Sequence, residues 1–270
     1  MRPRVVLLTS SSWEGQALSQ RLVDSGLEPV LIVREEPLLK FDYSLPSRLA
    51  RRLLGDRIVN ELAAFRRGSE VRRTLKWERT MHEASHAWLE AACQRISLEP
   101  CWPRSVQQFR THVLNDETTV ERVREAKPDV MVVFSTSLLR TPLLAIPTYG
   151  TLNGHSSLLP NYRGARSEFW QCYNDDQRHL GITIHLVDPR IDSGPILFQL
   201  PTPSTWPTDP FHLRAMNTLS ILEHYPQVIK DHLAGKIVPR AQGPSETKLY
   251  LKRDVTMEAR VELKRRTVGP

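Results

Sequence analysis

Cysteine is scarce in this sequence, and long apolar runs are missing. The 270 residues include three cysteines, Cys93, Cys101 and Cys172. They form no pair with metal-ligand spacing, and their odd number does not suit a disulfide framework, so we expect a reducing compartment. Near the N-terminus the apolar run "VVLL" gives way at once to "TSSS", which is too short for a signal peptide or a membrane span. The sequence therefore predicts a cytoplasmic protein without a membrane partner.

Internal repeats and low-complexity tracts are also absent. Hydrophobic residues make up 40% and charged residues 25% of the chain, as in an ordinary globular protein. The net charge of +7 is unevenly placed, because residues 47–80 hold 10 Arg or Lys against 4 Asp or Glu. Such a stretch could bind an anionic substrate, nucleic acid or a membrane surface, although a solvated helical face is its commoner origin. No RNA-binding signature accompanies it, so the sequence does not support a nucleic-acid partner.

Short apolar runs alternate with amphipathic segments along much of the chain. Buried strands are expected over residues 4–11, 28–34, 130–134, 148–155, 181–188 and 195–200. A helix over residues 13–26 joins the first two strands, which is how a doubly wound parallel sheet begins. The last two strands are expected to pair across the turn "PRIDSG". The pattern favours an α/β fold built on a mostly parallel sheet.

Residues 36–103 interrupt this rhythm and have a helical, Arg-rich pattern, so we interpret them as a helical insertion. Further helices are expected over residues 116–129 and 212–235, and a short tail follows. We predict that residues 1–200 form the core, insertion included. Residues 201–270 would form a C-terminal helix and tail packed on that core.

The segment "HEASH", from His82 to His86, satisfies the zinc-protease pattern H-E-x-x-H. Histidines four apart share a helix face and can bind Zn²⁺ while Glu83 acts as a base. A catalytic zinc needs a third protein ligand, and neither Glu90 nor Glu99 is a compelling choice. We therefore expect an amphipathic helix here rather than a metal site, and keep a zinc hydrolase as an alternative of another class.

A second constellation is spread along the chain. Asn153 and His155 end a predicted strand, which is where open α/β sheets bind ligands. Asp192 lies in a turn between two later strands, from which its carboxylate could reach the histidine. A histidine beside a carboxylate can hold a proton, and an asparagine amide can donate to an oxyanion. These residues suit acyl transfer to an amine, although such residues in loops are more often turn-formers and caps.

At these residues the sequence resembles the formyltransferase family, whose members use N10-formyltetrahydrofolate. The family pattern is Asn-x-His-x-Ser-Leu-Leu-Pro, then Arg-Gly or Lys-Gly, a Gly-x-Thr strand and Asp-x-Gly. The matching pieces here are Asn153, His155, "SLLP" at 157–160, "YRG" at 162–164, "GITIHLVD" at 181–188 and "IDSGPIL" at 191–197. The resemblance covers residues 126–200 well and the N-terminal strands loosely. It implies a Rossmann-like formyltransferase core and N-formyl transfer without a metal.

The resemblance also implies roles for individual residues. His155 would stabilise the oxyanion, Asn153 would donate to the same oxygen, and Asp192 would hold His155 charged and help to relay the proton of the amine. Two loops would bind the pterin ring of the donor through backbone groups; they comprise Phe134, Ser135, Thr136, Ser137 and Leu138, and Asp188, Pro189, Arg190 and Ile191. The acceptor side would be shaped by Ser157, Tyr162, Arg163 and Gly164.

The acceptor amine is a separate question. Methionyl-tRNA formyltransferases carry a further C-terminal barrel, whereas 70 residues follow Leu200 here. Glycinamide ribonucleotide formyltransferases have a Gly-rich phosphate loop where this chain has "TSSSWEGQ". Formyltetrahydrofolate hydrolases share the triad but usually carry an N-terminal regulatory domain, which this sequence lacks.

The remaining resemblance is to enzymes that formylate small molecules such as nucleotide-linked amino sugars. We expect an acceptor of that kind, with Arg51, Arg52, Arg66 and Arg67 as candidate ligands of its diphosphate. The loosely similar pieces are the aromatic pair at 169–170 and "KLYLKRD" at 248–254. A homodimer and a catalytically idle folate-binding scaffold on the same fold stay open.

Overall fold

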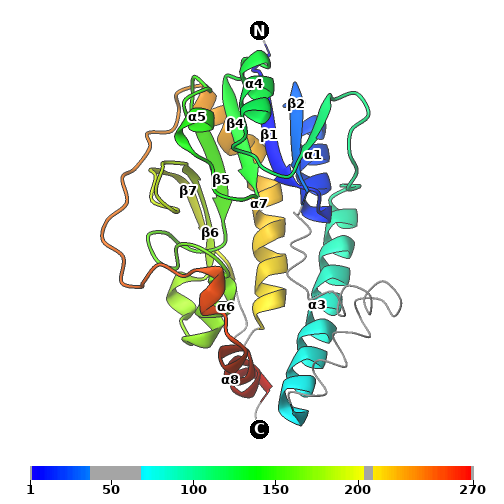
Figure 1. Ribbon diagram of the computed structural model, residues 1–270, viewed down its shortest axis with the longest axis vertical. Helices are drawn as coiled ribbons and strands as arrows, with labels where there is room; N and C mark the ends of the chain where they lie inside the picture. Colours follow the sequence, from blue (N-terminus) through cyan, green and yellow to red (C-terminus); the bar gives the residue numbers. More distant parts are fainter. Residues whose placement is uncertain (1, 37–67, 204–208, 269–270) are drawn as a thin grey trace.

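The computed structural model describes residues 2–36, 68–203 and 209–268. Within them the chain forms a seven-stranded sheet of order β3-β2-β1-β4-β5-β6-β7 (Figure 1). The strands are β1 Val5–Ser10, β2 Leu31–Glu35, β3 Gln108–Thr111, β4 Val130–Phe134, β5 Thr151–His155, β6 Gly181–Leu186 and β7 Ile196–Pro201. Strands β1 to β5 are parallel, and β6 and β7 are antiparallel additions at one edge. The predicted α/β fold with a mostly parallel sheet is confirmed, as is the β6–β7 pair.

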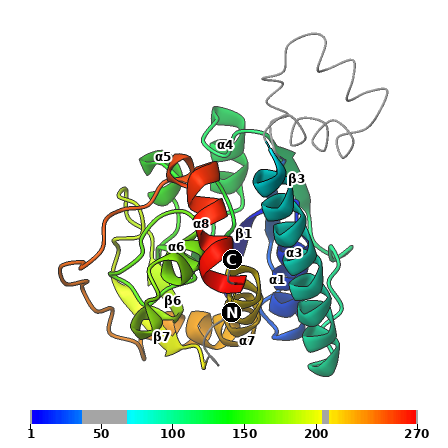
Figure 2. The ribbon, with the colours of Figure 1, turned by 90° about the horizontal axis from the view of Figure 1, so that it is seen from below.

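Helices cover both faces of this sheet. They are α1 Trp13–Asp24, α3 Ser69–Arg95, α4 Glu117–Glu125, α5 Thr141–Leu144, α6 Ser167–Tyr173, α7 Pro210–Leu233 and α8 Met257–Val268. Helices α1 and α7 and the end of α3 bury their apolar sides in one core with the sheet, and Figure 2 shows α1 beside α3. Helices α4 and α5 cover β1, β2 and β4 on the other face. No helix in the described ranges is long and apolar enough to cross a membrane.

The sequence signals for α1 act as predicted. Ser12 caps its first turn by accepting a hydrogen bond from the Gly15 amide at 3.2 Å. Leu18 and Leu22 point into the core, and the chain leaves the helix through Gly26 at φ 75°. The helix then returns the chain to β2 beside β1, which starts the doubly wound sheet.

The insertion predicted over residues 36–103 is described in part. Residues 69–95 form the single 27-residue helix α3, which packs against α7. Residues 37–67, which include Arg51, Arg52, Arg66 and Arg67, lie outside the described residues. The sequence analysis missed β3, because its four residues "QFRT" are mostly half-buried or exposed and form no apolar run.

The candidate site lies on β5 and β6, on the face of the sheet opposite α7. Loops, not helices, cover this part of the face. Gly154 faces α7, since a Cβ there would lie 2.9 Å from the Ile221 Cγ2 atom. Alternate residues of a strand point to opposite faces, so Asn153 and His155 project from the other face, beyond the cover of α4 and α5. Loops 156–166 and 187–195 fold over this part of β5 and β6.

Candidate active site

The three residues singled out from the sequence meet around the carboxylate of Asp192. Its Oδ2 atom lies 3.5 Å from His155 Nδ1 and accepts a hydrogen bond from the Gly164 amide at 2.8 Å. Its Oδ1 atom accepts from Asn153 Nδ2 at 3.4 Å. The predicted cluster is therefore assembled from residues up to 39 positions apart in the chain.

The surroundings of Asp192 favour its charged form. Burial by itself would raise the pKa of this carboxyl group. The neighbouring imidazole of His155 and the amide of Gly164 outweigh burial and hold the pKa well below its usual range. Asp192 is thus a carboxylate at neutral pH, with its negative charge turned toward His155.

The orientation of the His155 ring is set by a main-chain group. Its Nε2 atom lies 2.9 Å from the carbonyl oxygen of Tyr162, and a carbonyl can only accept, so Nε2 carries a hydrogen. This leaves Nδ1 as the ring atom that faces Asp192, at the longer distance of 3.5 Å. Protonation at Nδ1 would give both ring nitrogens an oxygen acceptor.

His185 is a member of the cluster that the sequence analysis missed. It lies opposite Asn153 in the β5–β6 pairing and is 1% exposed. Its Nδ1 donates to the Leu186 carbonyl at 2.8 Å, and its Nε2 lies 3.2 Å from Asn153 Nδ2. Nε2 also lies 3.6 Å from Asp192 Oδ1. The Asn153 amide nitrogen can only donate, so in this contact His185 Nε2 is the acceptor and the ring hydrogen lies on Nδ1.

This arrangement engages both hydrogens of the Asn153 amide within the protein. To donate to a substrate oxygen, Asn153 has to release one of these partners. The 3.4 Å contact with Asp192 is the longer of the two. His185 would then keep the amide in place during the exchange. The signal that could have identified His185 is its position in "GITIHLVD", two residues after the Thr of the Gly-x-Thr strand.

The two loops expected to bind the donor both adjoin this cluster. Residues 134–138 leave the end of β4, which is paired with β5 so that Val133 lies beside Asn153. Leu138 in this loop is 64% exposed, which leaves an apolar side chain at its surface. Residues 188–191 lead directly into Asp192. The Asp188 carboxylate accepts from the Arg190 amide and from Ser193 Oγ, so this side chain shapes its own loop.

These features fit a pterin, which is a flat ring with polar edges that needs backbone groups and an apolar contact. Ser135 adopts a left-handed backbone with φ 56°, which turns the chain sharply where β4 ends. In this loop the Ser137 amide donates to Glu35 and the Leu138 carbonyl accepts from Asn115, so the exposed Leu138 side chain is the apolar contact that the loop offers at the end of β4. Assignment of the individual residues 134–138 and 188–191 to the donor stays a prediction.

The residues predicted for the acceptor side occupy different environments. Ser157 is fully buried and donates to the Asn161 carbonyl at 2.7 Å, so it closes the loop and does not face a ligand. Tyr162 is 1% exposed, and its contribution to the site is its carbonyl oxygen. Arg163 is half-buried, and its buried Nε atom has no partner among the described residues. Of these four residues, Arg163 is therefore the one whose side chain has a donor, Nε, that the described residues leave free for an anionic ligand.

Gly164 is fixed by a close approach of two backbone segments. It has φ 98°, and a Cβ atom there would lie 2.0 Å from the Tyr250 carbonyl oxygen. No side chain fits at this position, and the left-handed conformation also favours glycine. Glycine thus allows its amide to reach Asp192 at 2.8 Å. These two contacts explain why glycine follows arginine in the "RG" of the sequence motif.

The "HEASH" segment lies on α3. His82 and Glu83 are exposed, and His86 contacts Glu90 at 3.4 Å through Nδ1. The His82 and His86 rings stack with their centroids 6.4 Å apart. Within the described residues there is no group of three or more His, Cys, Asp or Glu side chains that could hold a metal ion.

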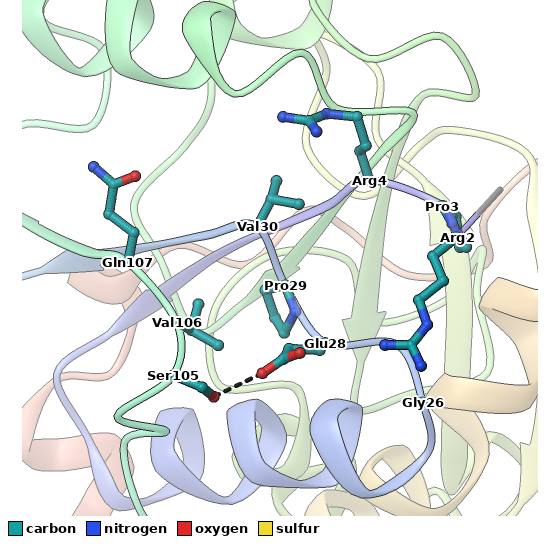
Figure 3. Close-up of a pocket in the computed structure, with 10 residues that line it drawn as sticks. All are labelled: Arg2, Pro3, Arg4, Gly26, Glu28, Pro29, Val30, Ser105, Val106 and Gln107. Atoms are coloured by element: carbon teal, nitrogen blue, oxygen red, sulfur yellow. Dashed lines mark hydrogen bonds between the residues drawn. The ribbon is translucent and has the colours of Figure 1, made fainter.

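A concave region of about 430 Å³ lies elsewhere, at the amino ends of β1 and β2 (Figure 3). Arg2, Arg4, Glu28 and Ser105 are among its lining residues. Figure 3 shows the Ser105 hydroxyl turned toward Glu28, to which it donates at 2.6 Å. Arg4 instead donates to the Ala126 carbonyl. This pocket contains none of the candidate catalytic residues.

Residues 82–210 match the sequence model of the formyl transferase family. A methionyl-tRNA formyltransferase of Trichlorobacter lovleyi is 34% identical over 129 residues, which is 47% of this chain and 40% of that protein. The chain thus spans less than half the length of this curated relative. Asn153, His155 and Asp192 lie within residues 82–210, the segment that matches the family model.

Solved structures extend the likeness to the fold of nearly the whole chain. A 4-N formyltransferase of Francisella tularensis aligns with TM-score 0.56 and 15% identity, over 100% of this chain and 90% of that structure. An N-formyltransferase of Helicobacter canadensis, in complex with folinic acid and dTDP-3-aminofucose, aligns with TM-score 0.54 and 12% identity, over 95% and 78%. Residues 82–210 thus match the formyl transferase family model, and the chain as a whole has the α/β fold of these solved formyltransferases.

Proposed function

We propose that this protein transfers the formyl group of N10-formyltetrahydrofolate to a primary amine of a small molecule. The observation that carries the proposal is the Asp192 carboxylate, held within reach of His155 Nδ1 and the Asn153 amide. Two donors and one fixed negative charge are what acyl transfer to an amine requires. The family match over residues 82–210 supports the same chemistry.

The bound donor would supply a formyl group whose carbon is attacked by the amine, with release of tetrahydrofolate. His155, anchored through Nε2 on Tyr162, donates from Nδ1 to the formyl oxygen as negative charge develops there. Asn153 becomes the second donor when it leaves Asp192. Asp192 balances the charge on His155 and relays the proton of the amine through water to N10 of the departing tetrahydrofolate, so that the leaving group gains the proton that the amine loses. The site thus provides positioning, charge stabilisation and proton transfer.

For the acceptor we propose an amine on a nucleotide-linked sugar. The Helicobacter canadensis enzyme of the same fold was solved with such a ligand. In this chain Arg166 follows Gly164 by two residues and is exposed to solvent. The guanidinium groups of Arg214 and Arg260 and the carboxylates of Glu168 and Glu78 lie near it, so three positive charges face two negative ones. This excess of positive charge suits the diphosphate of such an acceptor.

A mass-spectrometric screen of candidate amines with the folate donor tests the transfer. We expect an acceptor to gain one formyl group with the wild-type enzyme and not with His155→Gln. Asp231→Asn, on α7 outside the candidate site, serves as a control variant and should behave as wild type. Formate release without an acceptor would identify a hydrolase instead, and no donor turnover at all would refute the proposal.

Methionyl-tRNA belongs in the same screen, because the relatives over residues 82–210 carry that name. Turnover of methionyl-tRNA in preference to every small amine would overturn the acceptor assignment but leave formyl transfer intact.

Arg166→Ala tests the acceptor class directly. We expect the KM for a diphosphate-bearing acceptor to rise about tenfold, the effect of losing one charge-assisted contact of about 1.4 kcal/mol. The KM for the same amino sugar without its diphosphate should not change. Equal effects on both acceptors would refute a role for Arg166 in phosphate binding. Arg95→Ala, in the last turn of α3, is the matched control.

A further inference from the structure

We propose that residues 240–250, here called the C-terminal strap, position the catalytic residues by holding both loops that carry them. This inference rests on the proposed formyl transfer. The strap leaves the end of α7, follows the outer edge of β7 and then approaches α6 (Figure 1, orange segment). It lies entirely outside residues 82–210, which match the family.

The first part of the strap fixes the loop of Asp192. Arg240 and Ile196 exchange two backbone hydrogen bonds of 2.7 and 2.9 Å, which ties the strap to β7. Gln242 Nε2 then donates to the carbonyl oxygens of Asp192 at 3.0 Å and Gly194 at 2.7 Å. Asp192 has φ 47°, a left-handed conformation that needs support from its surroundings. By donating to these two carbonyl groups, the Gln242 side chain stabilises the left-handed conformation at Asp192.

The second part of the strap fixes the loop that orients His155. The Tyr162 amide donates to Thr247 Oγ1 at 2.8 Å. Tyr250 then pairs with the next residues, since its amide donates to the Arg163 carbonyl at 3.0 Å and its carbonyl accepts from Ala165 at 2.8 Å. These bonds flank the peptide whose carbonyl, that of Tyr162, holds His155 Nε2.

Tyr162 itself needs this restraint. It has φ 56°, which is costly for a residue with a bulky side chain. Its ring stacks on Tyr250 with centroids 5.7 Å apart and an interplanar angle of 7°. Its hydroxyl donates to Asp176 at 2.9 Å. The Tyr162 backbone is thus held on both sides, with Thr247 as the strap residue that bonds its amide.

The strap is also fastened behind this loop. The Glu246 amide donates to Asn161 Oδ1 at 2.7 Å, and an amide can only donate, so Asn161 presents Nδ2 to its other neighbour. That neighbour is His179 Nε2 at 2.8 Å, which therefore accepts. His179 Nδ1 in turn donates to Asp176 at 2.8 Å. Strap, Asn161 and Tyr162 belong to one network, so a shift of the strap is transmitted to the carbonyl that orients His155.

The test compares Thr247→Val, which removes the hydroxyl, with Thr247→Ser, which keeps it. Thr256→Val is the matched control, because the Thr256 hydroxyl accepts from Ala259 near the start of α8. We expect Thr247→Val to lower kcat about 10- to 100-fold, as a small misplacement of a catalytic group does. Donor and acceptor KM should change little, and Thr247→Ser should restore kcat. Gln242→Met should give a loss of the same kind, and it keeps the test decisive if Thr247→Val does not fold.

A second readout needs no turnover. The Nε2 proton of His155, assigned by its loss in His155→Gln, is followed by nitrogen-15 NMR in the protein without substrates. We expect it to exchange with water at least about tenfold faster in Thr247→Val than in wild type or Thr256→Val.

If wild type forms no formylated amine, the proposed function fails, and the exchange rates still decide the positioning role. Unchanged exchange and unchanged kcat in Thr247→Val and Gln242→Met would overturn the strap proposal. A raised KM with unchanged kcat would overturn it as well.

Discussion

Replacement of Asp192 by Asn removes one negative charge and changes the shape of the site very little. An asparagine oxygen can still accept from the Gly164 amide, which lies 2.8 Å away, so the loop should keep its conformation. The substitution removes the negative charge that lies beside His155 Nδ1. Asp192→Asn therefore separates the electrostatic role of this residue from its structural one.

The separation of the charges sets the scale of the effect. At 3.5 Å, two unit charges attract by about 5 kcal/mol with an effective dielectric constant of about 20. Desolvation of the pair reduces the net benefit. The loss of one preorganised stabilising group in acyl transfer costs about 2.7–4 kcal/mol, or about 100- to 1,000-fold in kcat. We expect a decrease in kcat within that range.

The assay is formyl transfer to the best amine from the screen, measured as kcat and as KM for donor and acceptor. Donor KM should stay within about threefold, since Asp192 acts on the charge that develops during reaction. Asp231→Asn, at a half-buried carboxylate on α7 that pairs with Lys236, is the control. A kcat within about threefold of wild type, or a loss seen only in KM, would refute the reasoning.

The same variant also has a pH signature in stability. The pKa of Asp192 is held below its ordinary value, so its carboxylate contributes stability that is present above about pH 4 and lost as the pH falls through the folded-state pKa. Thermal unfolding should therefore show the widest Tm gap between wild type and Asp192→Asn near neutral pH. The gap should narrow below about pH 4. A gap that stays constant with pH would contradict the assignment of a charged Asp192.

Two further predictions concern a backbone position and a metal. Gly164→Ala should lower the unfolding free energy by more than about 2 kcal/mol in denaturant titrations, because φ is 98° and the new Cβ would lie 2.0 Å from the Tyr250 oxygen. Gly243→Ala, where nothing lies within 4 Å of the new Cβ, should leave the unfolding free energy nearly unchanged. Equal effects of the two substitutions would contradict the close approach at Gly164. His82→Ala should leave kcat within about twofold of wild type, and elemental analysis of wild type should find no stoichiometric zinc; zinc that is lost together with activity in His82→Ala would restore the zinc-hydrolase alternative.

The strands and helices that could be predicted are those whose pattern of apolar and polar residues matches their burial in the fold. The fully buried "VMVVF" of β4 has apolar side chains on both faces, as central parallel strands require. The helical spacing of Leu18 and Leu22 in α1, ended by Gly26, likewise indicated a helix. Strand β3 could not be predicted, because an edge strand with half-exposed residues leaves no apolar pattern.

Some residues of the candidate site could likewise be predicted from the sequence, and one could not. Asn153, His155 and Asp192 could be found from the sequence because their side chains carry the chemistry. The structure brings them together, while their catalytic roles stay predictions. His185 could not be ranked, since a histidine on a buried strand is more often a core residue with satisfied hydrogen bonds.

The contributions that sequence patterns could not show are made by main-chain groups. The carbonyl of Tyr162 decides which nitrogen of His155 faces Asp192, yet every residue except proline could offer the same carbonyl and amide pair. What matters is where that carbonyl points, and this depends on a left-handed φ at Tyr162 and on Thr247, 85 residues away. The order of catalytic side chains in a motif therefore specifies the reacting groups, whereas their aim is set by distant residues that the motif does not contain. For this chain those residues lie in the C-terminal strap, so the activity should depend on a segment that the family match does not include.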